Sequence, residues 1–244
     1  MNKKLKQLIK YNSSRYRLFL EVQNFAQSIP EGFRVLDAGS GDSPYRDLFT
    51  HTNYSSTDFI KVDKNYTNPS FICDLSNIPI SDSYYNYIIF TQVMEHIIEP
   101  KFVLSELFRV LKPGGKLIYT GPLFYKEHEI PYDYYRYTQY GLRYLFEQAG
   151  FIIERLDWLE GYFGTLGYQY DRESRDLPWR PSQFPKKPFG FLFSPIFIII
   201  KVLAKINSVF FHTLEKVIKY QNSGYPKNYV SILRKSDDSK NGGL

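Results

Sequence analysis

The sequence predicts an α/β fold of the doubly wound type, in which helices cover both faces of a mostly parallel β-sheet. Short apolar runs alternate with helix-like stretches from residue 33 to residue 158. The first run leads directly into a glycine turn, read as RVLDAGSG at residues 34–41. Each of the first three runs ends in an aspartate, namely Asp37, Asp58 and Asp74. Because the carboxyl ends of parallel strands line one crevice, these features predict a ligand site at one edge of the sheet.

Seven stretches have the length and composition of strands. Six of them precede residue 160, and the fourth, YYNYIIFT, is strongly apolar. The seventh comes near the C-terminus, where NYVSILR alternates well enough for a last strand. The predicted strands are Phe33–Asp37, Asn53–Asp58, Phe71–Asp74, Tyr84–Thr91, Lys116–Thr120, Phe151–Trp158 and Asn228–Arg234.

Helices are predicted around these strands by apolar residues at helical spacing. Residues 1–28 form one or two basic amphipathic helices, and Pro100–Leu111 forms a helix that ends at a Pro-Gly-Gly sequence. Thr138–Ala149 forms another, with its threonine as the N-cap. A further helix is expected directly after the glycine turn, with Asp42 or Ser43 as its N-cap.

Residues 161–224 interrupt the alternation. The first part, 161–195, is rich in glycine, proline, aromatic and charged residues and is expected to be an irregular excursion. A long helix is then predicted from Ser194 or Pro195 to about Tyr220. Its polar residues recur every three or four positions and trace one narrow stripe on an otherwise apolar surface. They are Lys201, Lys205, Ser208, His212, Glu215 and Lys219.

Three environments suit a helix that is apolar around most of its girth. It could pack on the domain, pair with a second copy in a homodimer, or lie in a lipid interface. Pro188–Ile200 is uncharged for only 13 residues, whereas a membrane-spanning helix needs about 20. Peripheral contact through residues 186–220 and the basic segment 1–17, at the inner face of a membrane, is therefore the form of membrane association expected.

Charge and cysteine content restrict the partners and the compartment. The formal net charge is +6, yet residues 1–17 hold six basic side chains, and the remainder is balanced at 25 basic and 25 acidic residues. The basic excess is therefore not spread over a nucleic-acid-binding face. A single cysteine, Cys73, excludes an internal disulfide and a multi-cysteine metal site. With no secretion signal evident, the sequence predicts a cytoplasmic protein without a nucleic-acid partner or a metal site.

The glycine turn suits a nucleotide that carries no phosphate. A dinucleotide site would have a third glycine at the position of Pro44. Asp37, two residues before Gly39, suits a cationic amino group better than a pyrophosphate. A carboxylate at Asp58 can accept bonds from both ribose hydroxyls. These departures favour S-adenosylmethionine, which carries an ammonium and a sulfonium.

In order and spacing, the motifs resemble those of class I S-adenosylmethionine-dependent methyltransferases. DAGSG, Asp58, CDL, YYNYIIFTQVMEHI, FRVLKPGGKLIYTGP and FEQAGF carry the resemblance, which covers roughly residues 30–160 and 225–235. It implies a Rossmann-like seven-stranded sheet in the order 3-2-1-4-5-7-6, with strand seven antiparallel. The chain then divides into a basic N-terminal helical segment (1–30), the cofactor-binding domain (31–160 and 225–235), an insertion (161–224) and a disordered tail (236–244).

The resemblance also implies roles for the residues at the ends of the first four strands. The turn would hold the methionine half of the cofactor, the second aspartate the ribose, and the residues after the third strand the adenine. The pair after the fourth strand would lie near the transferred methyl group. The implied cofactor residues are Asp37, Gly39, Ser40, Gly41, Asp58, Asp74, Leu75, Thr91 and Gln92.

Methyl transfer is an in-line displacement, and a weak nucleophile such as a sugar hydroxyl can need a general base. His128 near Asp133 could form an oriented base or part of a structural lid, and His96 is a second candidate with a structural alternative. Arg136 could hold an anionic group. Aromatic rings beside it could stack on a sugar, shield the sulfonium or serve packing, namely those of Tyr132, Tyr134, Tyr135 and Tyr137.

The segment HEIPYDYYRYT resembles methyltransferases of bacterial surface-polysaccharide and lipid-linked glycan pathways. The leading hypothesis is therefore methylation of a small molecule or of a glycan, including a lipid-linked saccharide. A non-catalytic cofactor-binding or scaffolding domain with the same fold is the alternative. An RNA methyltransferase is disfavoured because the body of the chain is neutral and shows no separate RNA-binding module.

Overall fold

The computed structural model describes residues 13–59 and 68–237. The basic side chains at positions 3–10 and most of the predicted tail lie outside the described residues, as does much of the predicted membrane contact of residues 1–17.

A seven-stranded sheet in the order β3-β2-β1-β4-β5-β7-β6 organises the molecule. Strand β7 is antiparallel to both of its neighbours, and the other pairings are parallel. This arrangement confirms the predicted fold and strand order. The strands are β1 (Arg34–Ala38), β2 (Asn53–Asp58), β3 (Phe71–Ile72), β4 (Tyr85–Thr91), β5 (Leu111–Pro122), β6 (Ile152–Trp158) and β7 (Asn228–Arg234).

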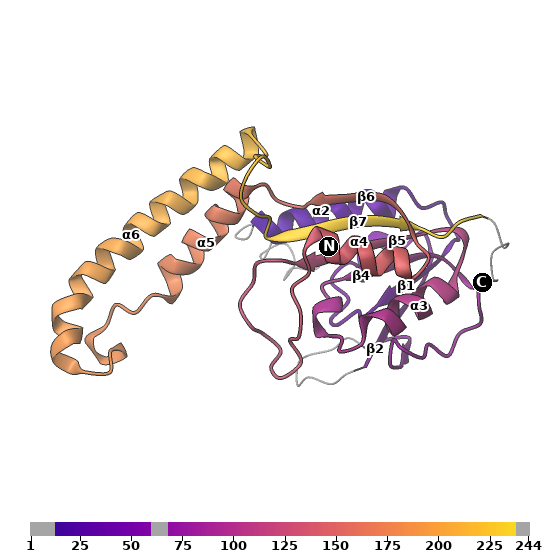
Figure 1. Cartoon of the computed structure of the whole chain (residues 1–244), viewed down its shortest axis with the longest axis horizontal. Coiled ribbons are helices and arrows are strands. Elements are labelled where there is room, and N and C mark those ends of the chain that lie inside the picture. The colour runs from indigo at the N-terminus through magenta and orange to yellow at the C-terminus, as the bar shows by residue number, and fades with distance from the viewer. Residues whose placement is uncertain (1–12, 60–67, 238–244) are drawn as a thin grey trace.

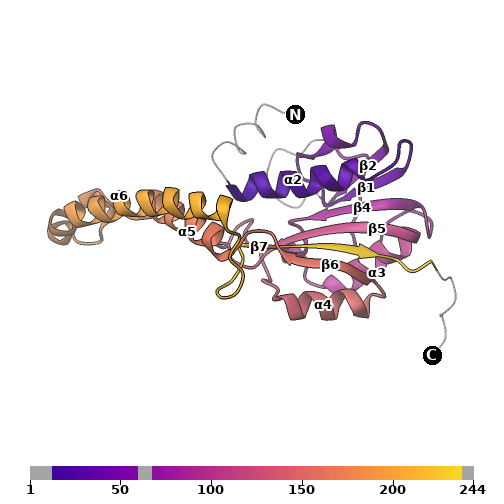
Figure 2. The ribbon, with the colours of Figure 1, turned by 90° about the horizontal axis from the view of Figure 1, so that it is seen from above.

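Helices cover both faces of the sheet (Figure 2). Helix α2 (Ser13–Gln27) lies on one face, and α3 (Pro100–Val110) and α4 (Gln139–Gln148) lie on the other. Consecutive residues of the central strands point to opposite faces, so Val35 joins the cluster under α2 and Leu36 the cluster under α3 and α4. Both side chains are fully buried. The near-continuous apolar runs of these strands follow from burial on both sides.

Two predicted boundaries near the glycine turn were wrong. The expected helix with Asp42 or Ser43 as its N-cap is a short 3-10 helix, η1 (Arg46–Phe49), and the residue before it, Tyr45, makes no side-chain capping bond. Ser43 has a φ of 46°, a left-handed conformation that interrupts any helix entering from the turn. Strand β3 is only two residues long, because the chain turns away before Asp74.

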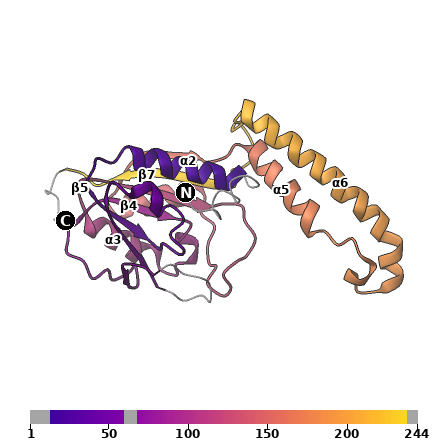
Figure 3. The same cartoon turned by 180° about the vertical axis from the view of Figure 1, so that it is seen from behind.

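The prediction of an irregular excursion over residues 161–195 was also wrong. This region contains α5 (Tyr162–Asp176) and the 3-10 helix η3 (Pro181–Gln183). The long helix α6 (Lys187–Val217) begins earlier than expected and contains Pro195 in its interior. Together α5 and α6 form a helical hairpin, here called the arm, that projects away from the sheet (Figures 1 and 3).

The glycines of this region, whose composition predicts loops, let the two helices of the arm approach each other. A Cβ atom placed on Gly167 would lie 2.6 Å from Nδ1 of His212 on α6. A Cβ atom on Gly164 would lie 3.0 Å from the carboxyl carbon of Glu215. The composition of α5 therefore reflects close helix packing.

The polar stripe of α6 faces α5. Lys201 Nζ donates to the carbonyl oxygen of Leu177 at 2.8 Å, and Ser208 Oγ donates to that of Gly167 at 2.9 Å. Lys205 Nζ lies 2.8 Å from a carboxylate oxygen of Asp171. The apolar residues of α6 consequently point outward, and many of them are more than half exposed. Those include Phe191, Leu192, Ile199, Val202, Leu203, Ile206, Val209 and Phe210.

Helix α6 is also longer than the uncharged stretch suggested. Among the described residues it is the one helix long and apolar enough, over Pro188–Val217, to cross a membrane by length and composition. Buried core helices of soluble proteins pass the same test, but only 17% of the tested window of α6 is buried.

Glu215 connects the base of the arm to the domain. Its side chain is buried, and its two oxygens accept hydrogen bonds from the backbone N–H groups of Gly161 (2.8 Å) and Gly164 (3.0 Å). Arg17 of α2 completes the contact at 3.0 Å. The carboxylate thus serves as an N-terminal cap for α5, supplied by a different helix.

We expect Glu215→Ala to destabilise the arm by about 2–4 kcal/mol, because it leaves buried N–H donors and a guanidinium without their acceptor. Hydrogen exchange of the α5 amides should become faster by the corresponding factor. The neighbouring exposed Lys216→Ala is the control and should leave that exchange unchanged. Equal protection of α5 in both variants would refute this role of Glu215.

Candidate active site

The turn after β1 is built from backbone groups that approach their neighbours closely. The N–H groups of Gly39 and Ser40 both donate to the carbonyl oxygen of Thr57 in β2, at 2.9 and 3.0 Å. Gly39 has a φ of 75°, and a Cβ atom there would lie 2.6 Å from the methyl carbons of Val93. The position therefore requires glycine for two independent reasons, backbone conformation and space.

The three predicted aspartates lie at the carboxyl ends of neighbouring strands, as expected. Asp58 accepts a 2.8 Å hydrogen bond from the N–H of Gly41, which ties β2 to the turn. Asp37 accepts a 2.6 Å bond from the hydroxyl of Tyr54. Asp74 accepts bonds from the N–H and the hydroxyl of Ser76. Together with the turn, these carboxylates border two adjoining cavities.

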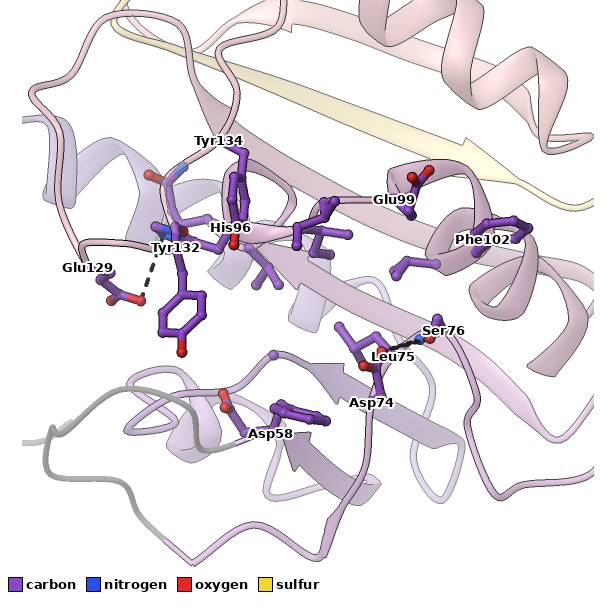
Figure 4. Close-up of a pocket in the computed structure, with 17 residues that line it drawn as sticks. Asp58, Asp74, Leu75, Ser76, His96, Glu99, Phe102, Glu129, Tyr132 and Tyr134 are labelled. Carbon is purple, nitrogen blue, oxygen red and sulfur yellow. Dashed lines mark hydrogen bonds and ion pairs between the residues drawn. The ribbon is translucent and has the colours of Figure 1, made fainter.

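The first cavity has a volume of about 410 Å³. Figure 4 shows Asp58 on one side of it and Tyr132, Glu129 and His96 on the opposite side, with Asp74 further along. Its lining contains eight of the predicted site residues. They are Gly39, Asp58, Asp74, Leu75, Gln92, His96, Tyr132 and Tyr134.

The second cavity, of about 350 Å³, lies on the other side of the turn. It also contains eight predicted residues, and four residues border both cavities: Gly39, Gln92, His96 and Glu129. The two cavities therefore adjoin at the turn and at the end of β4. The predicted residues of the second cavity are Asp37, Gly39, Ser40, Gly41, Thr91, Gln92, His96 and His128.

Four candidate residues from the sequence are not among the described residues that line either cavity: Asp133, Tyr135, Arg136 and Tyr137. The guanidinium of Arg136 donates to both oxygens of Asp133, at 2.7 and 2.8 Å. The hydroxyl of Tyr137 lies 3.5 Å from the carbonyl oxygen of Met94, and its ring packs against the core. The predicted catalytic role of Asp133 and the predicted substrate-binding roles of Arg136 and Tyr137 stay predictions, and the contacts observed here stabilise the loop.

Burial changes the protonation of Asp37. Removal of the carboxyl group from water raises its pKa to about 7, although the hydrogen bond from Tyr54 opposes the shift. The carboxylate therefore ionises near neutral pH and is stabilised by a cation brought into the second cavity.

His128 and Asp133 form the pair that the sequence suggested. Nδ1 of His128 lies 3.2 Å from Oδ2 of Asp133. Hydrogen bonds from Arg136 lower the pKa of Asp133, so this carboxylate is ionised and orients the imidazole. Burial lowers the pKa of His128, which favours the neutral ring with Nδ1 protonated and Nε2 as the available acceptor.

Two buried ionisable residues that could take part in function were not predicted from the sequence. Glu95, in the 3-10 helix η2 (Met94–His96), is 1% exposed, and burial raises the pKa of its carboxyl to about 8. Its position beside His96 was the only local signal. Lys227, just before β7, is also buried, and burial lowers the pKa of its ammonium to about 8. Nothing in the neighbouring sequence marks that lysine, because its surroundings come from distant segments.

Lys227 lies in the second cavity between two tyrosine rings. Its ammonium is 4.9 Å from the centre of the Tyr125 ring and 4.6 Å from that of Tyr168 in α5. Because Tyr168 belongs to the arm, this cation–π contact joins the cavity wall to the base of the arm. Lys227 and Arg15 are the lysine and the arginine among the described residues that line this cavity.

The described geometry agrees with a comparison of the chain with known protein families. A family model described as "Methyltransferase domain" matches residues 10–156. The chain belongs to this family. The predictions of a class I methyltransferase fold and of S-adenosylmethionine as its cofactor are confirmed.

Curated relatives share the domain but differ in length. A tRNA (carboxymethyluridine(34)-5-O)-methyltransferase of Arabidopsis thaliana is 28% identical over 117 residues, which are 45% of this chain and 29% of the relative. A ubiquinone/menaquinone biosynthesis C-methyltransferase of Burkholderia cenocepacia is 29% identical over 108 residues, 37% of this chain and 44% of the relative. The chain spans less than half the length of these relatives.

Solved structures show the same fold at low sequence identity. A phosphoethanolamine N-methyltransferase of Haemonchus contortus with bound S-adenosyl-L-methionine has a TM-score of 0.54 and 17% identity, covering 91% of this chain and 53% of its own. The [4+2]-cyclase SpnF has a TM-score of 0.51 and 15% identity, covering 88% and 81%. The fold is thus shared by a methyltransferase and a cyclase, so the acceptor must be inferred from the site.

The site of the methyltransferase domain fits the cofactor. Ser40 Oγ is buried in the turn and has no hydrogen-bond partner among the described residues, so it is available to a ligand. Gly39 leaves room where any side chain would collide with Val93. Asp37 would hold the amino group, and Asp58 the ribose, of a cofactor that lies across both cavities.

We expect Asp58→Ala to weaken binding of S-adenosylmethionine by about 1.5–3 kcal/mol, through loss of charge-assisted bonds to the ribose. Isothermal titration calorimetry measures this change. Asp58→Asn keeps an oxygen that can accept the hydrogen bond from the Gly41 N–H but removes the negative charge. It therefore measures the contribution of the charge alone. Asp157→Asn on the exposed edge strand β6 is the control. Unchanged affinity in Asp58→Ala would show that Asp58 does not bind the ribose of the cofactor.

The affinity for S-adenosylmethionine should fall as the pH is lowered from 7.5 to 5.5. Protonation of Asp37 near its raised pKa of about 7 removes the charge that attracts the ligand's ammonium. Affinity should drop by up to about tenfold per pH unit below that pKa. In Asp37→Asn the profile should be flat and the binding weak. A slope that persists in this variant would assign the pH dependence to another group.

Proposed function

We propose that this protein transfers a methyl group from S-adenosylmethionine to a saccharide carried on a lipid, at the cytoplasmic surface of a membrane. The observation that carries the proposal is the inverted arm: the polar stripe of α6 faces α5, and its apolar residues face outward. The base of this arm adjoins the second cavity through the contact between Tyr168 and Lys227.

The cofactor, when bound, supplies a methyl group on an electrophilic sulfonium. The chain's part is to hold the reactants in line and to exclude water. The glycine turn, Asp37 and Asp58 would fix the cofactor, and Thr91 and Gln92 would lie beside the methyl group. Displacement at the methyl carbon forms a bond to the acceptor oxygen and breaks the bond to sulfur.

The second cavity has the chemistry of a site for a charged, ring-bearing acceptor. Lys227 offers a cation, and Tyr125 offers an aromatic face next to it. His128 and His96 face the junction between the cavities and are the groups that could act on an acceptor hydroxyl. An anionic linker such as a phosphate on a lipid-linked sugar would be held by Lys227.

The arm has the features of a helical hairpin that lies on a membrane. Its outer helix exposes a continuous apolar surface, whereas α5 carries paired charges such as Arg172 with Asp176. Soluble helices bury the apolar face and expose the polar one, so the observed orientation leaves α6 exposed to water unless lipid or a second copy covers it. Trp179 and Arg180 near the tip are typical of an interfacial position.

An RNA acceptor is the second candidate, because two curated relatives are named as tRNA methyltransferases. The neutral composition outside residues 1–17 speaks against it. Transfer RNA therefore belongs in the acceptor screen as a competitor of the lipid-linked saccharides.

The test combines two measurements on the full chain. Release of S-adenosylhomocysteine is measured with lipid-linked saccharides, water-soluble saccharides and transfer RNA as acceptors. We expect turnover only with the lipid-linked fraction. Turnover with transfer RNA alone, or with no acceptor class despite cofactor binding, would overturn the proposal.

Flotation with vesicles that contain anionic phospholipid tests the arm separately. The protein should float with the vesicles. The double variant Ile199→Glu/Leu203→Glu should remain in the aqueous fraction, and its affinity for the cofactor should be unchanged. Tyr140→Glu/Tyr144→Glu is the matched control, because it places two charges on exposed residues of α4 and should float normally. Loss of flotation in both variants, or a stable dimer that these α6 changes dissociate, would contradict a lipid-facing arm.

A further inference from the structure

Three side chains at the junction of the cavities have an arrangement that the cofactor does not explain. Glu95 and His96 come from η2, and His128 comes from the loop after β5. One ligand atom from each lies within 4.8 Å of the other two. The two imidazole rings are edge to face with their centres 4.6 Å apart.

Backbone contact fixes the proton on His96. Its Nδ1 lies 2.6 Å from the carbonyl oxygen of Tyr132. A carbonyl can only accept, so Nδ1 carries the hydrogen and Nε2 keeps a free lone pair. Nε2 lies 3.9 Å from Oε1 of Glu95 and 3.9 Å from Oε2 of Glu129, the second contact being visible in Figure 4.

A carboxylate fixes the proton on His128 in the same way. Nδ1 faces Asp133, whose ionised carboxylate is itself held by both terminal nitrogens of Arg136. Nε2 of His128 is therefore its ligand atom. Histidines that bind metals commonly donate their other N–H to a carbonyl or a carboxylate, and here both do.

Glu95 supplies the independent observation that a ligand belongs here. Its side chain is 1% exposed, and neither oxygen has a hydrogen-bond partner among the described residues. An uncompensated buried carboxyl group is costly. The distance of 3.9 Å to His96 is too long for a hydrogen bond. A cation between the three side chains would satisfy both the carboxylate and the two imidazole lone pairs.

We infer that Glu95, His96 and His128 bind a divalent transition-metal ion. Two imidazoles and one carboxylate suit Zn²⁺, Co²⁺, Fe²⁺ or Mn²⁺ better than Mg²⁺ or Ca²⁺, which prefer oxygen ligands. Ligand atoms around such an ion lie roughly 3–4 Å apart, so small side-chain movements close the site. This inference departs from the expectation, stated in the sequence analysis, that the chain has no metal site.

The position of the site indicates its use, and this step rests on the proposed function. His96 borders both cavities, so an open coordination position faces the region between cofactor and acceptor. An acceptor hydroxyl bound there becomes more acidic and gives its proton to water. Its oxygen then bonds to the methyl carbon as the carbon–sulfur bond breaks, and the electron pair remains on sulfur. The histidines thus act on the acceptor through the ion.

Metal binding is testable without any acceptor. The full chain, stripped with a chelator and dialysed against Co²⁺, should retain one ion per chain and show visible absorption bands of a low-symmetry Co²⁺ site. His96→Ala, His128→Ala and Glu95→Gln should each lower the affinity at least about tenfold. His51→Ala removes a histidine whose Nε2 contacts Ile29 far from the site, and it should bind the ion as the parent does.

Asp133→Asn separates a metal site from a merely structural cluster. It removes the ionised partner of His128 without removing a ligand, and should weaken Co²⁺ binding by about 10- to 100-fold. Cofactor titration and thermal melting of each variant check the fold. A folded, cofactor-binding parent that retains no Co²⁺ overturns the inference, as do ligand variants that bind like His51→Ala. Metal binding without methyl transfer would refute the proposed function and leave the site standing.

Discussion

The close contact between the glycine turn and the ends of β2 and β4 is the constraint on which the rest of the site depends. Gly39 and Ser40 are held against Thr57, and Val93 fills the space where a side chain on Gly39 would lie. This contact leaves the turn's remaining groups facing ligand. The two cavities adjoin at the turn and at the end of β4, because Gly39 and Gln92 line both of them.

The sheet and the cofactor side could be predicted from the sequence because their signals are local. Each strand carries its own apolar run, and the aspartates follow those runs directly, so the parallel arrangement brings them together without further information. The acceptor side could not be predicted in the same way. Lys227 and Tyr125 are 102 positions apart, and only the antiparallel return of β7 beside β5 puts them in one cavity.

The long helix of the insertion was predicted, but α5 was not, because the same residue types occur both in loops and in closely packed helices. Glycines at 161, 164 and 167 read as loop formers when they are taken alone, but on α5 their spacing of three places them along the contact with α6. Pro195 in the sequence suggests a helix start, but it lies in the interior of α6, which begins at Lys187. The polar stripe of α6 is evident in the sequence. Which neighbour the stripe faces depends on α5, and the composition of residues 161–195 does not reveal that helix.

The arm and the metal cluster involve the same physical problem in opposite forms. On α6 the polar groups are satisfied within the protein, and the apolar surface has no covering among the described residues. At Glu95 the side chain is buried, and its carboxylate has no hydrogen-bond partner among the described residues. Each mismatch is destabilising for an isolated chain, and under the two proposals each would be removed by a different external component, lipid for the arm and a cation for the cluster. The arm contacts the second cavity through Tyr168 and Lys227, and the cluster contributes His96 and His128 to the lining of that cavity. Both proposals therefore concern the part of the molecule whose chemistry a fold shared with a cyclase leaves open.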